Sequence, residues 1–444
     1  MCQWHMSSTD RSGAETWECV ARSNSQAQIL QAMKGMKTLR SGRNRRNRRN
    51  RRKWIYVLLL MGLLGLSGCG SPSSASMDTS AEATSEITQA AETTQEERTE
   101  LVKTGSMELQ YAENFTVDYY EDGYKMLTTL PDSQRYLLVP EGQPVPQGLD
   151  EDVSILQKPL QNIYLVASGA MDMFASLDAV DQIRFSGQKQ ENWYIQTAKD
   201  AMAAGNMIYA GKYSKPDYEL LVSEGCDLAI ENRMITHSPE VVEMLQSFDI
   251  PVMIEYSSYE QHPLGKVEWV KFFGALTGKE AKAEEAFAEQ TEILEEVESG
   301  EKTGKTIAFF YVTSNGLIQV RQSTDYIPKL IELAGGRYIF ENLEDSGSGR
   351  STLNMQVEDF YAGAKDADIL IYNSSIDGGV TTVDELIGKC NILKDFKAVQ
   401  EGQVYCTTND MYQQSMAVGY LLQDMHTVLT DDDTAKLRYL FLLQ

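Results

Sequence analysis

Short apolar runs alternate with amphipathic stretches along the chain from Gln161 onward. The runs are "IYLVA" (163–167), "IRFSG" (183–187), "MIYAG" (207–211), "DLAIE" (227–231) and "PVMIE" (251–255). Their short length and their β-branched and aromatic residues predict buried strands. In the intervening segments, such as "SPEVVEMLQSFDI", apolar residues recur every three or four positions, which predicts helices. Alternating strands and helices predict a parallel sheet with right-handed crossovers.

A second series begins at "KTIAFFYV" (305–312) and continues through "GLIQVR", "YIPKLIELAGG", "ADILIYNSS" and "GQVYCTT". Between the two series, residues 263–299 have the pattern of an almost unbroken helix. Its apolar residues are Trp269, Phe272, Phe273 and Leu276 on one stripe and Phe287, Leu294 and Val297 on a later one. At 1.5 Å per residue, positions 280–298 would span about 28 Å, enough to bridge two domains. We therefore predict an α/β fold in which two doubly wound α/β lobes are connected by a single long α-helix, with a ligand cleft between the lobes.

Alternation in "FTVDYY" and "RYLLVP" predicts further strands between residues 106 and 152, ahead of the first lobe. We place an N-terminal α/β lobe at 105–262, a connecting helical segment at 263–300 and a C-terminal α/β lobe at 301–444. Residues 1–68 form an extension with a signal peptide, and residues 69–104 form a tether.

The apolar run "WIYVLLLMGLLGLS" (54–67) follows the basic stretch "RNRRNRRNRRK" and ends at "GCG". It is shorter than the roughly 20 residues that a helical membrane span takes. Basic, apolar and small-residue regions in this order predict a secretory signal. The sequence up to Cys69 also resembles the bacterial lipobox, in which the cysteine is lipidated and becomes the first residue. We therefore expect a lipid anchor at Cys69 on the extracytoplasmic face of the cell membrane; a signal anchor followed by an incidental cysteine is the alternative.

The segments on either side of this signal differ in charge. Residues 1–53 carry 13 Lys or Arg and 3 Asp or Glu and show no sustained apolar periodicity, so we expect no domain there. Either Met33 or Met36 is a candidate for the true start, and nucleic-acid binding by the arginines is the weaker alternative. Subtraction from the totals of 40 basic and 64 acidic residues leaves 27 and 61 after Cys69, a formal charge of −34. Such acidity argues against nucleic acid or an anionic lipid surface as a partner.

Residues 70–104 consist mainly of Ser, Thr, Ala and Glu. They contain too little apolar surface to offset the entropy of ordering, which predicts a flexible tether. A random coil of about 35 residues would reach roughly 30 Å from the membrane.

Three cysteines follow Cys69, namely Cys226, Cys390 and Cys406. An odd number without CxxC spacing predicts neither a disulfide framework nor a zinc site. We expect buried thiols, with a bridge between Cys390 and Cys406 as the alternative because export permits oxidation. The histidines after the signal, His237, His262 and His426, also lack metal-ligand spacing, so we expect no resident metal or other cofactor.

Several segments in order resemble the substrate-binding proteins of iron-siderophore and cobalamin ABC importers. They are "KPLQNIYLVASGAMDMFASLDAVDQIRFSG", "YAGKYSKPDYELLVSEGCDLAIEN", "HSPEVVEMLQSFDIPVMIEY", "LIELAGGRYIF" and "ADILIY", and the resemblance covers residues 161–444. It implies two α/β lobes joined by one long helix, in agreement with the pattern above. It also implies an extracytoplasmic lipoprotein that captures a metal chelate, such as a ferric siderophore, haem or a cobalamin-like molecule, and delivers it to an ABC permease and its ATPase.

In open parallel sheets, ligands bind beyond the carboxyl ends of the strands. We therefore expect ligand contacts from residues that follow the predicted strands, from aromatic residues in "QENWYIQ", and from arginines that can bind an anionic chelate. In the first lobe these are Ser168, Gly169, Met171, Trp193, Tyr194, Lys212, Tyr213, Asn232, Arg233, Tyr256 and Tyr259. In the second lobe they are Ser314, Asn315, Arg321, Arg350, Asn373, Ser374, Asn409 and Asp410. A packed or solvated side chain is the competing interpretation for each.

The resemblance further implies one glutamate on each lobe that pairs with arginines of the permease. Local patterns place them at Glu219 in "KPDYELLVSEG" and at Glu358 in "NMQVEDFYAG". Charge-assisted pairs at both ends would fix orientation as well as affinity. Ordinary exposed helix glutamates are the alternative.

No nucleophile motif or carboxylate pair of defined separation appears, so we expect no enzyme. The glycine-rich "EDSGSGRS" (344–351) lacks the lysine of a P-loop, and we expect it to carry Arg350 toward the cleft. We expect a monomer that closes on a bulky iron or cobalt complex by a small hinge motion, because a stiff helix limits opening. The alternatives are a ligand-sensing or adhesive lipoprotein with the same fold and, less favoured, a carboxylate-dependent hydrolase.

Overall fold

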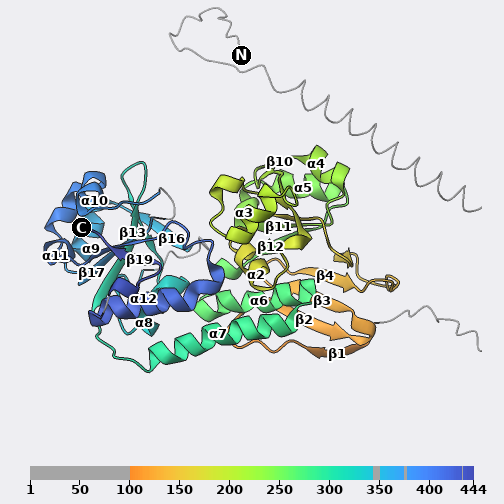
Figure 1. Cartoon of the computed structure of the whole chain (residues 1–444), viewed down its shortest axis with the longest axis horizontal. Coiled ribbons are helices and arrows are strands. Elements are labelled where there is room, and N and C mark those ends of the chain that lie inside the picture. Colours follow the sequence, from red (N-terminus) through yellow and green to blue (C-terminus); the bar gives the residue numbers. More distant parts are fainter. Residues whose placement is uncertain (1–100, 344–350, 375–377, 433) are drawn as a thin grey trace, which may run out of the picture. The chain divides into compact units, whose positions relative to one another are not determined.

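The computed structural model describes residues 101–343, 351–374, 378–432 and 434–444 (Figure 1). Contacts divide the chain into residues 1–92 and 93–444, and all described residues belong to the second unit. The predictions for the signal, for Cys69 and for the tether therefore lie outside the described residues, as does Arg350.

The described chain begins with a five-stranded sheet that is separate from the two lobes. Its strands are β1 (Lys103–Ser106), β2 (Phe115–Tyr120), β3 (Lys125–Thr129), β4 (Gln134–Val139) and β5 (Val153–Gln157), paired in that order. The first four strands are antiparallel, and β5 runs parallel to β4. The predicted strands in this region are thus confirmed.

The first lobe is built on a parallel sheet with the order β12-β11-β6-β7-β8. These strands are β6 (Ile163–Leu165), β7 (Ile183–Ser186), β8 (Ile208–Tyr209), β11 (Leu228–Asn232) and β12 (Val252–Glu255). The connections hold α2 (Ala170–Ser176), α3 (Gln196–Ala203), α4 (Tyr218–Glu224), α5 (Pro239–Ser247) and the short strands β9 (Gly211–Lys212) and β10 (Lys215–Pro216). All five apolar runs form strands as predicted. Successive residues of a strand, such as Tyr164 and Leu165, pack into different apolar clusters, so both faces of the sheet are covered.

The second lobe is built on a mixed sheet with the order β16-β14-β13-β17-β18-β19, and β15 also pairs with β13. The strands are β13 (Thr306–Val312), β14 (Ile318–Arg321), β15 (Arg337–Tyr338), β16 (Thr352–Met355), β17 (Ile369–Tyr372), β18 (Val404–Thr407) and β19 (Leu440–Leu442). Its α-helices are α8 (Tyr326–Leu333), α9 (Val357–Ala364), α10 (Val383–Lys389), α11 (Lys397–Gln400) and α12 (Val418–Thr430). The centre of the sheet is parallel, but β14, β16 and β19 are antiparallel to their neighbours, which corrects the expectation of a purely parallel sheet.

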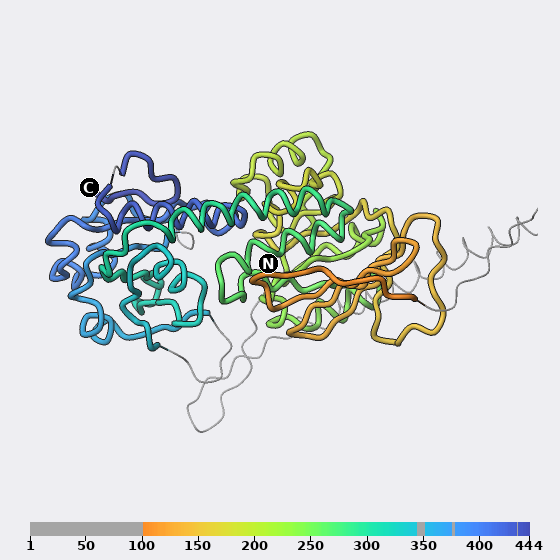
Figure 2. The backbone as a smooth tube through the Cα atoms, turned by 90° about the horizontal axis from the view of Figure 1, so that it is seen from below, coloured from red at the N-terminus to blue at the C-terminus, as the bar shows by residue number. Residues whose placement is uncertain are grey.

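Two helices connect the lobes, where the sequence pattern predicts one. Helix α6 (Pro263–Thr277) ends at Gly278, whose φ of 77° is left-handed, and α7 (Glu280–Glu298) then packs back along α6 (Figure 2). A glycine in this conformation is a common helix terminator because it has no Cβ to clash. Beyond α6, the 19-residue α7 packs against α12 and α8 of the second lobe. The expectation of an almost unbroken helix is therefore wrong at Gly278, while α7 by itself makes the long connection.

The amino-terminal sheet is fastened to α6 by two buried carboxylates. Glu268, which is fully buried, accepts hydrogen bonds from the backbone N–H groups of Gln110, Tyr111 and Ala112 at 2.8–3.1 Å. Glu260 accepts in the same way from the next two residues at 2.9 and 3.0 Å. Carboxylates that accept several N–H groups offset their own desolvation, so the segment ahead of β2 is held closely against the helix.

One apolar cluster extends from the amino-terminal sheet through α6 and α7 to α8 and α12. Its largest side chains include Trp269, Phe272 and Phe273 of α6, as the predicted stripe requires. Because each sheet also has a separate cluster on its other face, the lobes share packing along these helices and are otherwise built independently.

Candidate functional site

The strands of the first lobe end in loops that contain most of its predicted ligand residues. Ser168 and Gly169 follow β6 and are half-buried, whereas Lys212 in the β9–β10 hairpin is exposed. Met171 and Trp193 are instead in the core, with 0 and 1% of their surface exposed. These two side chains support the loops from inside, and their role as ligand contacts stays a prediction.

Arg233, Tyr256 and Tyr259 form one cluster beyond β11 and β12. The Arg233 guanidinium lies 4.5 Å from the centroid of the Tyr259 ring, and Tyr256 approaches the same ring edge-on at 6.5 Å. Such stacking of a guanidinium on an aromatic ring suits a flat, anionic partner. Burial, together with the neighbouring Asp132 carboxylate, raises the pKa of Tyr256 above its ordinary value. Asp132 comes from the β3–β4 turn, so the amino-terminal sheet reaches this cluster.

The loop that follows β7 is bridged to the second lobe by Gln413. The Gln413 amide oxygen accepts a hydrogen bond from the Tyr194 N–H at 2.8 Å, and its nitrogen donates to the Asn192 carbonyl at 2.8 Å. Gln413 is fully buried, while the Tyr194 ring is 43% exposed. Loops from the carboxyl ends of the two sheets are therefore in direct contact.

A second contact between the lobes lies at the start of α2. The Asp172 carboxylate accepts a hydrogen bond from the Met416 N–H, within the short 3-10 helix Ser415–Ala417 that precedes α12. Burial raises the pKa of Asp172 to about 6, although this N–H and the Lys266 ammonium oppose the shift. Gly169 is close to the same segment, because a Cβ added to it would lie 2.9 Å from Ser415 Oγ.

The predicted ligand residues of the second lobe differ in exposure. Ser314 and Asn315 are exposed, but they lie in the turn of the β13–β14 hairpin, which the Asn-Gly dipeptide favours. Asn373 and Ser374 are almost completely buried, and the Ser374 hydroxyl donates to the Thr407 carbonyl. In this conformation the two residues pack within the sheet, and their role as ligand contacts stays a prediction.

The remaining described candidates of the second lobe, Arg321, Asn409 and Asp410, are partly buried. Arg321 lies 3.4 Å from the Asp325 carboxylate and stacks over the Phe309 ring. Burial raises the pKa of Asp325, which the guanidinium opposes. Asn409 donates to the Gly378 carbonyl at 3.3 Å and, like Asp410, is half-buried.

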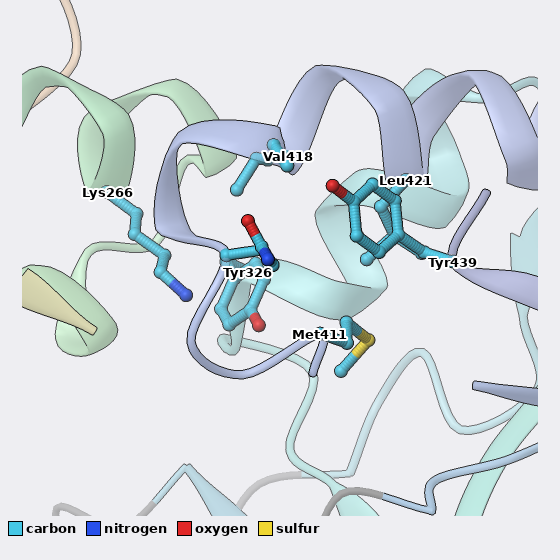
Figure 3. Close-up of a pocket in the computed structure, with 8 residues that line it drawn as sticks. Lys266, Tyr326, Met411, Val418, Leu421 and Tyr439 are labelled. Atoms are coloured by element: carbon cyan, nitrogen blue, oxygen red, sulfur yellow. The ribbon is translucent and has the colours of Figure 1, made fainter. Parts of the chain in front are cut away.

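A small cavity lies where α6 meets α8 and α12 (Figure 3). It is lined by Lys266, Tyr326, Met411, Gln414, Ala417, Val418, Leu421 and Tyr439. The Lys266 side chain extends toward Tyr326, with its ammonium 4.8 Å from the ring centroid. The cavity measures about 10 Å³, room for about one water molecule. This cavity is therefore too small for a bulky ligand.

The described residues contain no group of three or more His, Cys, Asp or Glu side chains that could hold a metal ion. Cys226, Cys390 and Cys406 are free thiols, so the alternative of a bridge between the last two is not observed. In the part of the chain that the structure describes, no helix has the length and apolarity of a membrane span.

Glu219 and Glu358, the predicted docking residues, are exposed in the first turns of α4 and α9. They lie on different lobes, as a two-point contact requires. Neither side chain takes part in a hydrogen bond or ion pair within the described residues, so both carboxylates face solvent.

No protein-family model matches the chain. An uncharacterized lipoprotein of Methanocaldococcus jannaschii is 24% identical over 352 residues, covering 72% of this chain and 81% of the relative. Another uncharacterized lipoprotein of the same organism is 25% identical over 323 residues, covering 70 and 79%. Both relatives are described as lipoproteins, and the chain covers about four fifths of each.

Solved structures also align with the chain. A possible iron-binding periplasmic solute-binding protein of Staphylococcus epidermidis is 16% identical, covers 61% of this chain and 98% of its own, and has a TM-score of 0.48. A periplasmic haem-binding protein of Vibrio cholerae is 14% identical, with coverages of 60 and 98% and a TM-score of 0.48. An Fe3+-hydroxamate ABC transport protein of Saccharomonospora viridis is 17% identical, with coverages of 61 and 93% and a TM-score of 0.46.

The structure has the two α/β lobes that the sequence predicts.

Four residues of the site were missed by sequence reasoning, namely Asp132, Asp172, Lys266 and Gln413. Lys266 and Asp172 lie in helices, so a search for residues that directly follow strands does not include them. Gln413 does follow β18, in "NDMYQQS", but six residues beyond the strand. A signal for Asp132 was its place in the "LPDS" turn between two predicted strands.

Proposed function

We propose that this chain is the extracytoplasmic solute-binding lipoprotein of an ABC importer. It captures a metal chelate, such as a ferric siderophore, haem or a cobalamin-like molecule, and delivers it unchanged to the permease. The observation that carries the proposal is the contact of Gln413 with Asn192 and Tyr194, through which loops at the carboxyl ends of the two sheets meet. Ligands of open α/β sheets bind at such ends.

Binding in this proposal is closure without chemistry. The lobes separate to admit the ligand and close around it, and α7 limits the motion because a packed helix has few residues free to change φ and ψ. The cavity between α6 and the second lobe measures about 10 Å³ and is too small for such a ligand, so the proposed site is formed only as the lobes move. Small-angle scattering should therefore show a more compact particle with ligand than without it.

The cluster of Arg233 and Tyr259 is the strongest candidate for a ligand contact in the first lobe. A guanidinium stacked on an aromatic ring offers hydrogen-bond donors at its edge and a flat surface at its side. Both features suit an anionic chelate whose metal is already supplied with ligands. Tyr194 and Lys212 are exposed at the same end of the sheet and remain candidates.

The direct test is native mass spectrometry of the full-length lipoprotein purified from membranes of its own host. The proposal expects a bound mass and an iron or cobalt signal in elemental analysis. A protein that carries no solute and binds none of a panel of ferric siderophores, haem and cobalamin would overturn it. The same spectrum reports whether Cys69 carries lipid.

Delivery to the permease is tested separately through Glu219 and Glu358. Reversing both charges, by Glu219→Arg with Glu358→Arg, should abolish uptake into cells while the affinity for ligand stays unchanged. The matched control is Glu240→Arg with Glu401→Arg, which changes two other exposed glutamates, one on each lobe. Normal uptake by the first double variant would refute the docking role.

A further inference from the structure

Gln413 presents its side-chain amide to a short backbone edge of the other lobe. Its oxygen accepts from the Tyr194 N–H and its nitrogen donates to the Asn192 carbonyl, each at 2.8 Å. The same nitrogen also donates to the Tyr412 hydroxyl at 3.0 Å. The side chain is fully buried, so all of its polar atoms are used within the protein.

The backbone edge selects the chemistry of its partner. An N–H is always a donor and a carbonyl always an acceptor, so the partner must offer an acceptor to residue 194 and a donor to residue 192. A primary carboxamide or a peptide group does this with two adjacent atoms, whereas a carboxylate has no donor. The orientation of the Gln413 amide is fixed by the same argument.

The backbone edge is held in place by the buried side chain of Trp193, which lies between its two residues in sequence. The indole nitrogen of Trp193 donates to Ser186 Oγ at 3.0 Å, and that hydroxyl donates to the Gln188 carbonyl at 2.6 Å. Trp193 is 1% exposed, so the residue between Asn192 and Tyr194 is locked in the core. A preorganised edge binds an amide at little cost in entropy.

The edge also lies beside surfaces that a ligand can reach. The residues Tyr194 and Tyr412 are 43 and 36% exposed. Gly169, after β6, lies under the Tyr412 backbone, since a Cβ added to it would be 3.7 Å from the Tyr412 carbonyl oxygen. The partly exposed Tyr412 contacts the Gln413 amide directly through its hydroxyl, and the partly exposed Tyr194 contributes its backbone N–H.

We propose that the backbone edge of Asn192 and Tyr194 is a carboxamide-binding subsite. Gln413 occupies it in this structure, and a carboxamide or peptide group of the solute competes with Gln413 for it. The part that concerns the solute rests on the proposed function; the subsite itself does not.

Hydrogen exchange of the full-length lipoprotein, with acetamide as the probe, tests the subsite. In Gln413→Ala the Tyr194 amide loses its acceptor, and its exchange should accelerate about tenfold. Acetamide at molar concentration should restore most of the protection, and acetate at the same concentration should not. Gln414→Ala, which truncates the neighbouring glutamine, is the matched control and should exchange like the wild type.

A second variant keeps the test decisive if the alanine protein does not fold. Gln413→Asn retains the amide but shortens the side chain by one methylene, so it should give the same acceleration and the same rescue by acetamide. Unchanged exchange in both variants, or equal protection by acetate and acetamide, would overturn the subsite. The solute that copurifies from the host should contain a carboxamide or peptide group; a solute without one would overturn the competition while leaving the transport proposal intact.

Discussion

The Asp172 carboxylate of the first lobe accepts a hydrogen bond at 2.7 Å from the backbone N–H of Met416 in the second. This bond ties α2 to the segment that leads into α12. Burial is the main cause that raises the pKa of Asp172 to about 6, from an ordinary value of 3.8. The contact between the lobes is therefore sensitive to pH between about 4 and 6.

We expect the free energy of unfolding to fall as the pH rises from about 4 to 6. In that range the folded protein retains a proton on Asp172 that the unfolded chain has released, so rising pH favours unfolding. The shift corresponds to roughly 3 kcal/mol. Asp172→Asn, which keeps an oxygen acceptor for Met416, should flatten this part of the profile in urea unfolding at several pH values. Asp181→Asn, at an exposed position nearby, should leave the profile of the wild type.

Glu231 predicts a second pH effect at higher pH. It is fully buried in β11, and neither carboxylate oxygen has a hydrogen-bond partner within the described residues. Burial raises its pKa to about 8, from 4.5. The free energy of unfolding should therefore decrease as the pH rises from about 4.5 to 8. In this range the unfolded chain has released the Glu231 proton, whereas the folded protein still holds it.

Replacing this carboxyl by a neutral group should remove the decline. Glu231→Gln should be more stable than the wild type at pH 8, by at most about 5 kcal/mol, and nearly equal to it at pH 4.5. Thermal unfolding at the two pH values measures the difference. The exposed Glu243→Gln on α5 serves as the control; a Glu231→Gln protein that keeps the pH slope of the wild type would contradict the assignment.

Gly169 has a packing role that can be tested with Ser415. Its φ of −68° suits any residue, so the constraint is space: the added Cβ would lie 2.9 Å from Ser415 Oγ. Gly169→Ala should cost about 1–2 kcal/mol through overpacking. Ser415→Ala removes the crowded oxygen, which is buried without a hydrogen-bond partner among the described residues, and should restore stability in the double variant.

The measurement is a double-mutant cycle by urea unfolding, in which coupling between the two positions is the expected sign. Gly388→Ala, where an added Cβ meets nothing within 4 Å, is the control. Additive effects at positions 169 and 415 would show that the two residues do not limit each other.

The local pattern of apolar residues was sufficient to predict the strands, because a run such as Ile163–Leu165 is apolar and buried at each position. The break at Gly278 was missed although a glycine after an apolar stripe is a recognised stop signal; the stripe that resumes at Phe287 concealed it. The antiparallel β14 was also available from the Asn315–Gly316 turn, which was interpreted as a ligand loop.

The contacts between lobes could not be predicted in this way. Gln413 and Tyr194 are 219 positions apart, and nothing in either local sequence identifies the other. Burial of Trp193 and Met171 is likewise a property of the assembled lobe. The rule that ligand residues follow strands selects Arg233 and Tyr259, which lie beyond β11 and β12, but it does not distinguish side chains that point into the core.

The carboxylate of Glu268 should be the main attachment of the amino-terminal sheet. It accepts four hydrogen-bond contacts from three consecutive backbone N–H groups, starting at Gln110, and pairs with Lys271 at 3.3 Å. Glu268→Ala would leave these buried donors without an acceptor and would remove the buried one of the two carboxylates that pair with Lys271, which costs roughly 3–5 kcal/mol. Hydrogen exchange should show loss of protection in residues 107–117 first, with the sheets of the two lobes little changed. Glu284→Ala removes the exposed second partner of Lys271 and should have a small effect. Uniform loss of protection across the chain would show instead that Glu268 supports the shared core as a whole. Protection equal to that of the wild type would show that the sheet is attached without the Glu268 carboxylate.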